Sequence, residues 1–365
     1  MNIRTRTMLV VACVVLCGPR SGIGQDSFVH SAAVDAAVKG QMKQQQLVGV
    51  AIGVIQDSKV VYTQGYGFSN LQQRTPVSDR SVFNWASNSK PVMAVAALQL
   101  VETGQLDLDV AIEKYLPDLA DPLRTVTTRQ LLCHQSGISH YSNGRIVPAG
   151  KRVNARQELD PFYSIQRFAL SPLIFRPGSK TDYSSYAYVL LSAVVQAAGK
   201  QAIGTQIAER IGRPLDLESF QLDLPFRGQK HWVTAYKKNN GVAEPIEDYA
   251  HFWKHGAGGY KSDVRDFAKF ANALANQQLI KEKTATAMWT NQTTDDGAKS
   301  NYGLGVVVEG GGRLLKISHN GSQDETRTRM VLYPRQGHGV VVMCNTQGAL
   351  AGRISTAVYA AMNRR

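Results

Sequence analysis

The chain has 365 residues, with 41 lysines and arginines against 28 acidic residues, which gives a formal charge of +13 at pH 7. This length allows one large domain or two, and the composition is that of an ordinary globular protein with a sizeable core. The basic residues are scattered and form no stripe with aromatic residues, which argues against a nucleic-acid partner. We interpret the charge as a generally basic surface, which an anionic cell-wall polymer would also attract.

The first 24 residues have the pattern of a secretory signal. Arg4 and Arg6 precede an apolar run over 8–17, and Gly22-Ile23-Gly24 follows as a small-residue cleavage site. The run has about ten residues, too few to span a bilayer, and no later run is longer. We therefore expect a cleaved leader over 1–24, a periplasmic or secreted protein, and no transmembrane segment.

Cysteine positions bear on both anchoring and redox state. A lipid anchor on Cys13 is an alternative to the cleaved leader, but it leaves almost no apolar core before the cysteine. Cys133 and Cys344 lie beyond the leader and could pair in an oxidising compartment. Their apolar neighbours favour buried free thiols instead.

The predicted elements differ in type along the chain. A helix over 30–46 precedes a β-hairpin with strands at 47–55 and 59–66, and a buried helix then runs from about Ser87 to near Gly104. Helices and loops fill 105–254, including an apolar helix over 186–198 that Gly199 ends. The remaining expected elements are a helix over 262–275, strands at 314–318, 328–333 and 339–343, and a closing helix over 354–362.

Strands at both ends of the chain with helices between them predict an α/β fold. We expect an antiparallel sheet flanked by helices and built from both chain ends. The α/β domain would comprise 25–104 and 255–365, and an inserted all-helical region would occupy 105–254.

The most informative motif is Ser87-x-x-Lys90, at the head of the apolar run. Residues three apart share a helix face, so the Ser87 hydroxyl and the Lys90 amine should lie within reach of each other. A lysine in a dry site loses its charge more readily and can then take a proton from a serine nucleophile. Pro91 fits only if the helix begins near Ser87, because a proline deeper inside would break it.

Two further segments can complete this chemistry. Tyr183 and Ser185 stand just before the predicted helix over 186–198, and a phenol near a cationic lysine can have its pKa lowered enough to relay protons. His319-Asn320-Gly321 ends a predicted strand. The histidine there could bind a substrate carboxylate or the phenol, and Gly321 would let a substrate backbone lie close.

These segments occur in the order that is typical of one superfamily. Ser87-x-x-Lys90, Tyr183-x-Ser185 and His319-x-Gly321 resemble the three motifs of serine β-lactamases and penicillin-binding proteins, with the spacing of class C β-lactamases, D-peptidases and related carboxylesterases. Three flanking segments also resemble that family: Leu131–Gly137, Gly258–Ser262 with Asp266, and Tyr302–Gly305.

The resemblance implies a β-lactamase/transpeptidase-like fold and a two-step acyl transfer to water without a cofactor. Lys90 or Tyr183 would deprotonate Ser87, and the backbone N–H groups of Ser87 and Ser322 would form the oxyanion hole. Ser185, His319, Asn320 and Gly321 would bind the substrate, a small amide, ester or peptide.

The chain departs from the class C pattern at two positions. Ser185 stands where an asparagine is usual, and His319 stands where a lysine is usual. A histidine with an ordinary pKa near 6.5 would be a weaker, pH-dependent partner for a substrate carboxylate. We therefore expect an exported peptidase or esterase. The alternatives are a true β-lactamase, and a penicillin-recognising binder or sensor that turns over slowly.

Other classes of site find little support in the sequence. There is no G-x-S-x-G elbow and no glycine-rich phosphate loop or dinucleotide fingerprint. His251 and His255 are four residues apart, but Phe252 stands where H-E-x-x-H requires glutamate. We expect no metal site.

Overall fold

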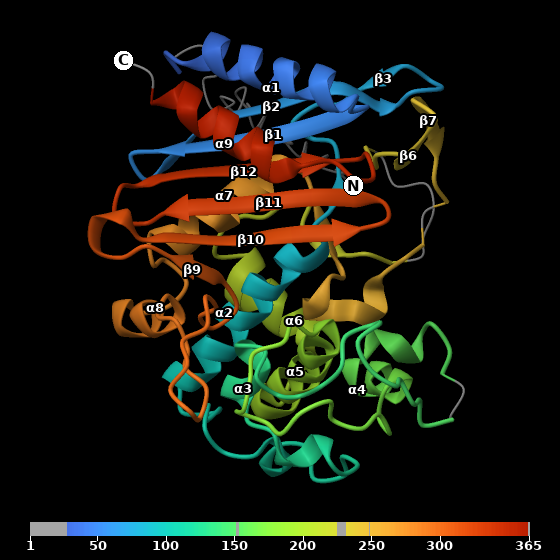
Figure 1. Ribbon diagram of the computed structural model, residues 1–365, viewed down its shortest axis with the longest axis vertical. Coiled ribbons are helices and arrows are strands. Elements are labelled where there is room, and N and C mark those ends of the chain that lie inside the picture. Colours follow the sequence, from blue (N-terminus) through green and yellow to red (C-terminus); the bar gives the residue numbers. More distant parts are fainter. Residues whose placement is uncertain (1–27, 151–152, 225–230, 248, 364–365) are drawn as a thin grey trace, which may run out of the picture.

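A seven-stranded antiparallel sheet forms the centre of the computed structural model, which describes residues 28–150, 153–224, 231–247 and 249–363 (Figure 1). The strand order is β3-β2-β1-β12-β11-β10-β9. The strands are β1 (Gly49–Gln56), β2 (Lys59–Asn70), β3 (Thr75–Pro76), β9 (Val307–Glu309), β10 (Lys316–Gln323), β11 (Thr326–Tyr333) and β12 (His338–Cys344). Because β1 pairs with β12, the sheet combines both ends of the chain, as expected.

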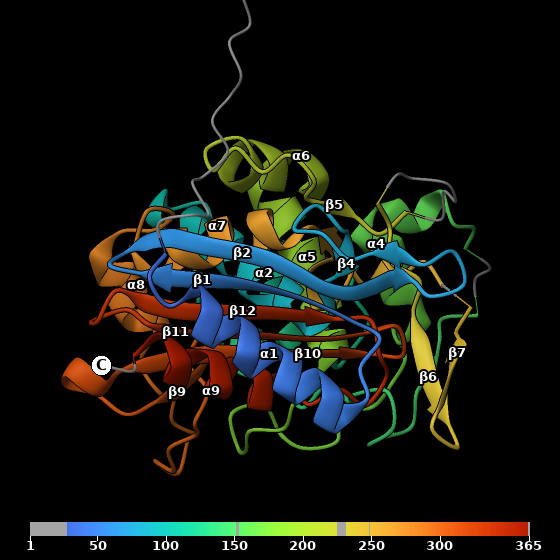
Figure 2. The same ribbon diagram turned by 90° about the horizontal axis from the view of Figure 1, so that it is seen from above.

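Helices cover both faces of this sheet. Helices α1 (Ser31–Gln45) and α9 (Ala351–Met362) lie together on one face, and α7 (Val264–Ala275) lies on the other (Figure 2). Alternation along the strands explains the two layers, since Val50, Ile52 and Val54 of β1 point into the core beneath α1 and α9. The larger core lies on the α7 face and continues into the helical region.

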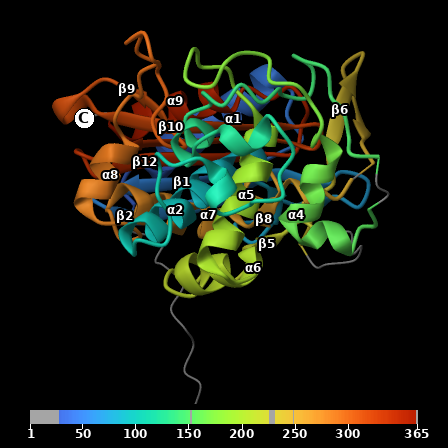
Figure 3. The same ribbon diagram turned by 90° about the horizontal axis from the view of Figure 1, so that it is seen from below.

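Helix α2 (Ser89–Glu102) connects the sheet to the helical region, where it packs against α5 (Ser185–Gly199) (Figure 3). Residues 89–98 of α2 are all buried, which is what an apolar run with no polar stripe requires. The other helices are α3 (Thr128–Leu132), α4 (Pro161–Ser164), α6 (Ile203–Ile207) and α8 (Glu282–Met288).

The expected fold class is confirmed, with one difference in the middle of the chain. The region 105–254 is not all helical, because it contains the hairpin of β6 (Tyr236–Asn239) and β7 (Val242–Pro245). Asn240 and Gly241 turn this hairpin with positive φ angles of 50° and 83°. A small sheet of β4 (Phe83–Asn84), β8 (Tyr260–Ser262) and β5 (Gln221–Leu222) also joins this region to the rest of the fold.

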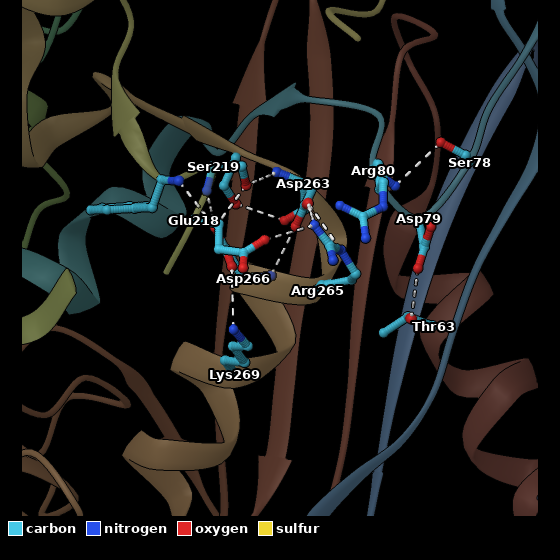
Figure 4. Close-up of polar contacts among 12 residues, drawn as sticks. Thr63, Ser78, Asp79, Arg80, Glu218, Ser219, Asp263, Arg265, Asp266 and Lys269 are labelled. Carbon is cyan, nitrogen blue, oxygen red and sulfur yellow. Dashed lines mark hydrogen bonds and ion pairs between the residues drawn. The ribbon is translucent and has the colours of Figure 1, made fainter. Parts of the chain in front are cut away.

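Asp266 fastens the start of α7 to the chain segment beside it (Figure 4). Its Oδ2 accepts hydrogen bonds from the backbone N–H groups of Ser219 and Phe220 and from the Ser219 hydroxyl. Asp263 caps the helix by accepting from the Asp266 N–H at 3.0 Å. These bonds tie the end of the helical region to the helix that supports the sheet.

The expectations about export concern residues that the structure does not cover. The predicted leader over 1–24, the cleavage point before Gln25 and the alternative anchor Cys13 all lie outside the described residues. In the part of the chain that is described, no helix combines the length and apolar character needed to cross a membrane. Cys133 and Cys344 are buried free thiols, and burial raises the pKa of each to about 12.

Candidate active site

Ser87 and Lys90 lie at the junction of a short turn and a buried helix. Ser87 belongs to the 3-10 turn η2 (Ala86–Asn88), and α2 begins directly after it at Ser89. Lys90 is fully buried, and its Nζ donates to Ser87 Oγ at 3.1 Å. Ser87 remains partly exposed. The motif therefore provides a hydroxyl that a substrate can reach, backed by an amine that water cannot reach.

The backbone just before Ser87 is strained. Ala86 has a φ of +48°, a left-handed conformation that is costly for a residue with a Cβ. Asn84 holds it in place, because its Oδ1 accepts from the Ala86 N–H at 2.7 Å. Asn84 is itself fixed by a bond of 2.9 Å from its Nδ2 to Asp223. The strain is thus maintained by buried polar contacts, and it turns Ser87 toward the site.

Two further acceptors complete the surroundings of the Lys90 amine. Its Nζ donates to Ser185 Oγ at 3.1 Å and to the Ala257 carbonyl at 2.7 Å. Ala257 ends the segment η8 (Phe252–Ala257), which packs closely on α2. Gly256 permits this approach, since a Cβ there would lie 2.5 Å from Met93. Lys90 thus contacts three segments that are far apart in the sequence.

The electrostatics of Lys90 and Tyr183 favour a neutral pair. Burial lowers the pKa of Lys90 well below its ordinary value, and the charge of Lys254 lowers it further. Burial raises the pKa of the Tyr183 phenol, and hydrogen bonds with Ser87 and Ser185 counter only part of this rise. A neutral amine has two N–H groups and one lone pair. It can therefore donate to Ser185 and Ala257 while the Ser87 hydroxyl donates to its lone pair, so Lys90 can accept the proton of Ser87.

The raised phenol pKa contradicts the lowered one that the sequence suggested. The expectation assumed that a charged Lys90 would stabilise a phenolate. Lys90 Nζ does lie 4.8 Å from the centre of the Tyr183 ring. However, burial opposes charge on both groups, and the rings of His134 and His140 lie 4.3 and 5.6 Å from that of Tyr183. Tyr183 is therefore suited to donate a proton.

His319 is buried and both of its ring nitrogens are engaged. Nδ1 lies 2.7 Å from the Asn320 carbonyl, so it carries the proton, and Nε2 accepts from the Tyr302 hydroxyl at 2.8 Å. Burial lowers the pKa of His319 to about 3, and the charge of Lys90 lowers it further. The expectation of a pH-dependent partner for a substrate carboxylate was therefore wrong.

The strand register separates the Asn320 side chain from the other predicted site residues. His319 pairs with Met330 on the face toward α2, whereas Asn320 pairs with Arg329 on the opposite face. The Asn320 side chain is exposed, and its Oδ1 accepts from Arg329 Nη1 at 2.8 Å. The structure therefore does not bring this side chain together with Ser87, Lys90 and Tyr183.

Gly321 serves the packing of the protein itself. A Cβ at this position would lie 2.0 Å from Thr328 Oγ1 and 2.5 Å from the Trp85 carbonyl. We expected the glycine to admit a substrate backbone, but the backbone that comes close is the turn before Ser87. Ser322 follows directly on β10, the strand that packs against this turn.

Several neighbours of the site had no motif that singled them out. The Ala257 carbonyl belongs to the backbone, so no residue type identifies it in the sequence. Only the neighbouring glycines, Gly256, Gly258 and Gly259, indicated close packing there. Tyr302 and His134 fell inside segments noted for their resemblance, without an assigned contact. His134 Nδ1 accepts from the Ser184 N–H at 3.2 Å, and His140 Nδ1 accepts from the Ser185 N–H at 3.1 Å. Both histidines thereby orient the start of α5.

The arrangement has the parts that acyl transfer requires. It combines a reachable hydroxyl, a neutral buried amine beside it, and a protonated phenol close to both. Across the described residues, no group of three or more histidine, cysteine, aspartate or glutamate side chains is arranged to hold a metal ion.

Comparison with known proteins places this geometry in context. The sequence profile of the family described as Beta-lactamase matches residues 34–361. Human mitochondrial serine beta-lactamase-like protein LACTB is 25% identical, over 86% of this chain and 76% of that protein. Esterase EstB of Burkholderia gladioli is 28% identical, over 60% of this chain and 58% of that protein. The D-amino acid amidase of Ochrobactrum anthropi SV3, solved with D-phenylalanine, superposes with a TM-score of 0.74 at 19% identity, covering 90% of this chain and 99% of the amidase chain.

We predict that Gly321→Ala displaces β10 from the turn that carries Ser87. The added methyl group would overlap the Trp85 carbonyl and the Thr328 hydroxyl. A shift of about 1 Å at the nucleophile can cost roughly 100-fold in rate, so p-nitrophenyl acetate hydrolysis should fall by about that factor. The thermal midpoint should fall as well.

Gly311→Ala is the matched control. Gly311 has an extended φ of −175°, and nothing lies within 4 Å of a Cβ built on it. This variant should keep wild-type activity and stability. Equal activity of the two variants would contradict the packing role of Gly321.

Proposed function

The chain belongs to the beta-lactamase family of serine hydrolases, and from that premise we propose that it cleaves an amide or ester bond through an acyl-enzyme on Ser87. The observation that carries this proposal is the position of the buried Lys90 amine, 3.1 Å behind the partly exposed Ser87 hydroxyl. The similarity to an esterase and to the fold of a D-amino acid amidase supports substrates of these two classes.

The proposed reaction proceeds in two steps. In the first, Lys90 takes the Ser87 proton, and Oγ bonds to the substrate carbonyl carbon. The oxyanion accepts hydrogen bonds from the Ser87 and Ser322 backbone N–H groups. Tyr183 gives its proton to the leaving amine or alcohol as the bond to it breaks, and Lys90 returns a proton to Tyr183. In the second, water attacks the ester carbonyl and loses its proton to the same pair. The bond between the acyl carbon and Ser87 Oγ then breaks, the pair returns the proton to Oγ, and the acid is released.

The two pKa directions support one of the two candidate bases. A lowered amine pKa and a raised phenol pKa both favour Lys90 as the group that accepts the Ser87 proton. Tyr183 then acts as the acid toward the leaving group. The neutral His319 leaves the carboxylate of a β-lactam without a charged partner at that position, which disfavours the β-lactamase alternative.

Ser87 should be the residue that forms the covalent intermediate. Ser185 is the alternative candidate for the nucleophile, because its Oγ lies at the same 3.1 Å distance from Lys90 Nζ. Ser185 is only 3% exposed, so a fluorophosphonate probe should label Ser87 in peptide mass mapping. Ser87→Ala should lose both labelling and p-nitrophenyl ester turnover. A label on Ser185, or full activity of Ser87→Ala, would refute this assignment.

Lys90 and Tyr183 should act as one unit for proton transfer. Lys90→Ala and Tyr183→Phe should each lower the rate of acylation by orders of magnitude, and the double variant should lose little more. Because the base must be neutral, kcat/KM should rise with pH. The midpoint of this rise should lie well below the ordinary lysine pKa of about 10.4. Tyr163→Phe, on α4, serves as a control that should keep the wild-type profile. Strictly additive losses would show instead that the two groups work separately.

We further propose that the protein is exported after removal of residues 1–24. The proposal depends on the basic start, the short apolar run and the small residues at 22–24. Expression with the native leader should give periplasmic or secreted protein whose N-terminal sequence begins at Gln25. Full-length protein in the cytoplasm, or lipid on Cys13 by mass spectrometry, would be the contrary result.

A further inference from the structure

A buried cation next to the proposed site has no role in the mechanism above. Lys254 belongs to η8, the segment whose Ala257 carbonyl accepts from Lys90, and only 9% of its surface is exposed. Its Nζ lies 5.5 Å from the centre of the Tyr141 ring and 5.6 Å from that of Trp253. The ammonium therefore lies within cation–π distance of two aromatic rings.

Among the described residues, Lys254 has no anionic partner. Within the described parts of the chain, no carboxylate lies at ion-pair distance from its Nζ. The nearest acids are engaged elsewhere, since Glu325 lies 2.9 Å from His251 Nε2 and Asp223 lies 2.8 Å from Lys261 Nζ. A buried charge without a partner is costly, and such groups are found mainly where function requires them.

The amine keeps much of its charge despite burial. Desolvation lowers the pKa of Lys254 to about 8, while the carboxylates of Glu325, Asp324 and Asp223 act to raise it. The Arg167 guanidinium opposes them; it lies 4.3 Å from the centre of the Trp253 ring and is bound to Glu158 at 2.5 Å. At neutral pH the Lys254 side chain is therefore mostly cationic.

Several contacts connect this cation to the nucleophile. Lys254 lies over the Tyr141 ring, Ser185 lowers the pKa of the Tyr141 phenol, and Ser185 accepts from Lys90. The charge of Lys254 also lowers the pKa of both Lys90 and His140, so the groups are electrostatically close. Tyr141 is 40% exposed, which leaves its side open to a bound molecule.

We propose that Lys254 determines specificity by binding a carboxylate on the substrate, so that the preferred substrates are amides or esters that carry a negative charge. This inference depends on the proposed hydrolase function and names its substrate class. A substrate carboxylate would supply the missing ion-pair partner of Lys254. The carboxylate would be bound by Lys254 of η8, on the side of Tyr141 and Trp253. It would not be bound by His319, because the imidazole of His319 has no free donor.

The test compares matched substrates that differ in one charge. Glutaryl p-nitroanilide and pentanoyl p-nitroanilide differ on the acyl side, and the butyryl esters of 3-hydroxybenzoate and phenol differ on the leaving-group side. In at least one pair, the wild type should favour the charged member in kcat/KM. Lys254→Met should lower that preference about tenfold or more, mainly through KM, and Lys254→Arg should retain most of it.

The preference is the ratio of kcat/KM for the charged substrate to that for the neutral one. An effect of the substitution on Lys90 therefore cancels. Losing the charge of Lys254 also raises the pKa of Lys90, but this affects both members of a pair equally. Lys114→Met is the matched control, because Lys114 Nζ also lies over a tyrosine ring, at 5.7 Å from the centre of Tyr115. It should leave every preference unchanged.

A second measurement needs no variant. In the wild type, 3-carboxyphenylboronic acid should inhibit more tightly than phenylboronic acid if a cation lies beside the nucleophile. An unchanged preference in folded Lys254→Met, or equal inhibition by the two boronic acids, would overturn the role of Lys254 while leaving the hydrolase intact. Absence of turnover of every substrate, together with an unlabelled Ser87, would overturn the proposed function and this inference with it.

Discussion

The structure depends on the burial of one amine. Lys90 lies without solvent contact at the start of α2, and each of its three hydrogen-bond acceptors comes from a different part of the chain. Removing an ammonium from water costs several kcal/mol unless it is well paired, and here its partners are two hydroxyls and a carbonyl rather than a carboxylate. The surroundings therefore suit a neutral amine, whose two N–H groups and one lone pair match these three contacts. This constraint fixes α2, α5 and η8 relative to one another.

The groups around Lys90 share this preference for neutrality. His134, His140 and His319 all have pKa values lowered chiefly by burial, and the phenols of Tyr183, Tyr188 and Tyr302 have raised ones. The histidines thus orient main chain and phenol groups without adding charge. Lys254 is the exception, because it remains cationic at neutral pH next to this neutral group. In the proposed reaction, this division would separate proton transfer, which needs neutral partners, from the attraction of an anionic substrate.

Local patterns predicted much of this arrangement, and their limits have physical causes. The apolar run after Ser87 predicted a helix buried on most sides, and its first turn contains the buried Lys90. The alternation of a strand would have separated Asn320 from His319, and Asn240-Gly241 is a strong hairpin signal in a region we expected to be helical. By contrast, the role of the Ala257 carbonyl could not be predicted, because every residue has a backbone carbonyl and the sequence does not mark the one that accepts from Lys90. The protonation state of His319 depends on its burial and on its hydrogen bond with Tyr302. Both are known only from the tertiary structure.

The pairing of β1 with β12 also has a consequence for how the protein assembles. Strand β12 is the central strand of the seven, yet it is the last strand to be synthesised. The hairpin of β1 and β2 can form early, but its neighbour in the sheet arrives almost 300 residues later along the chain. Until then α2 lacks the surface of β10 and β11 against which its preceding turn packs. The turn that carries Ser87 therefore reaches its final geometry only after these late strands have been synthesised.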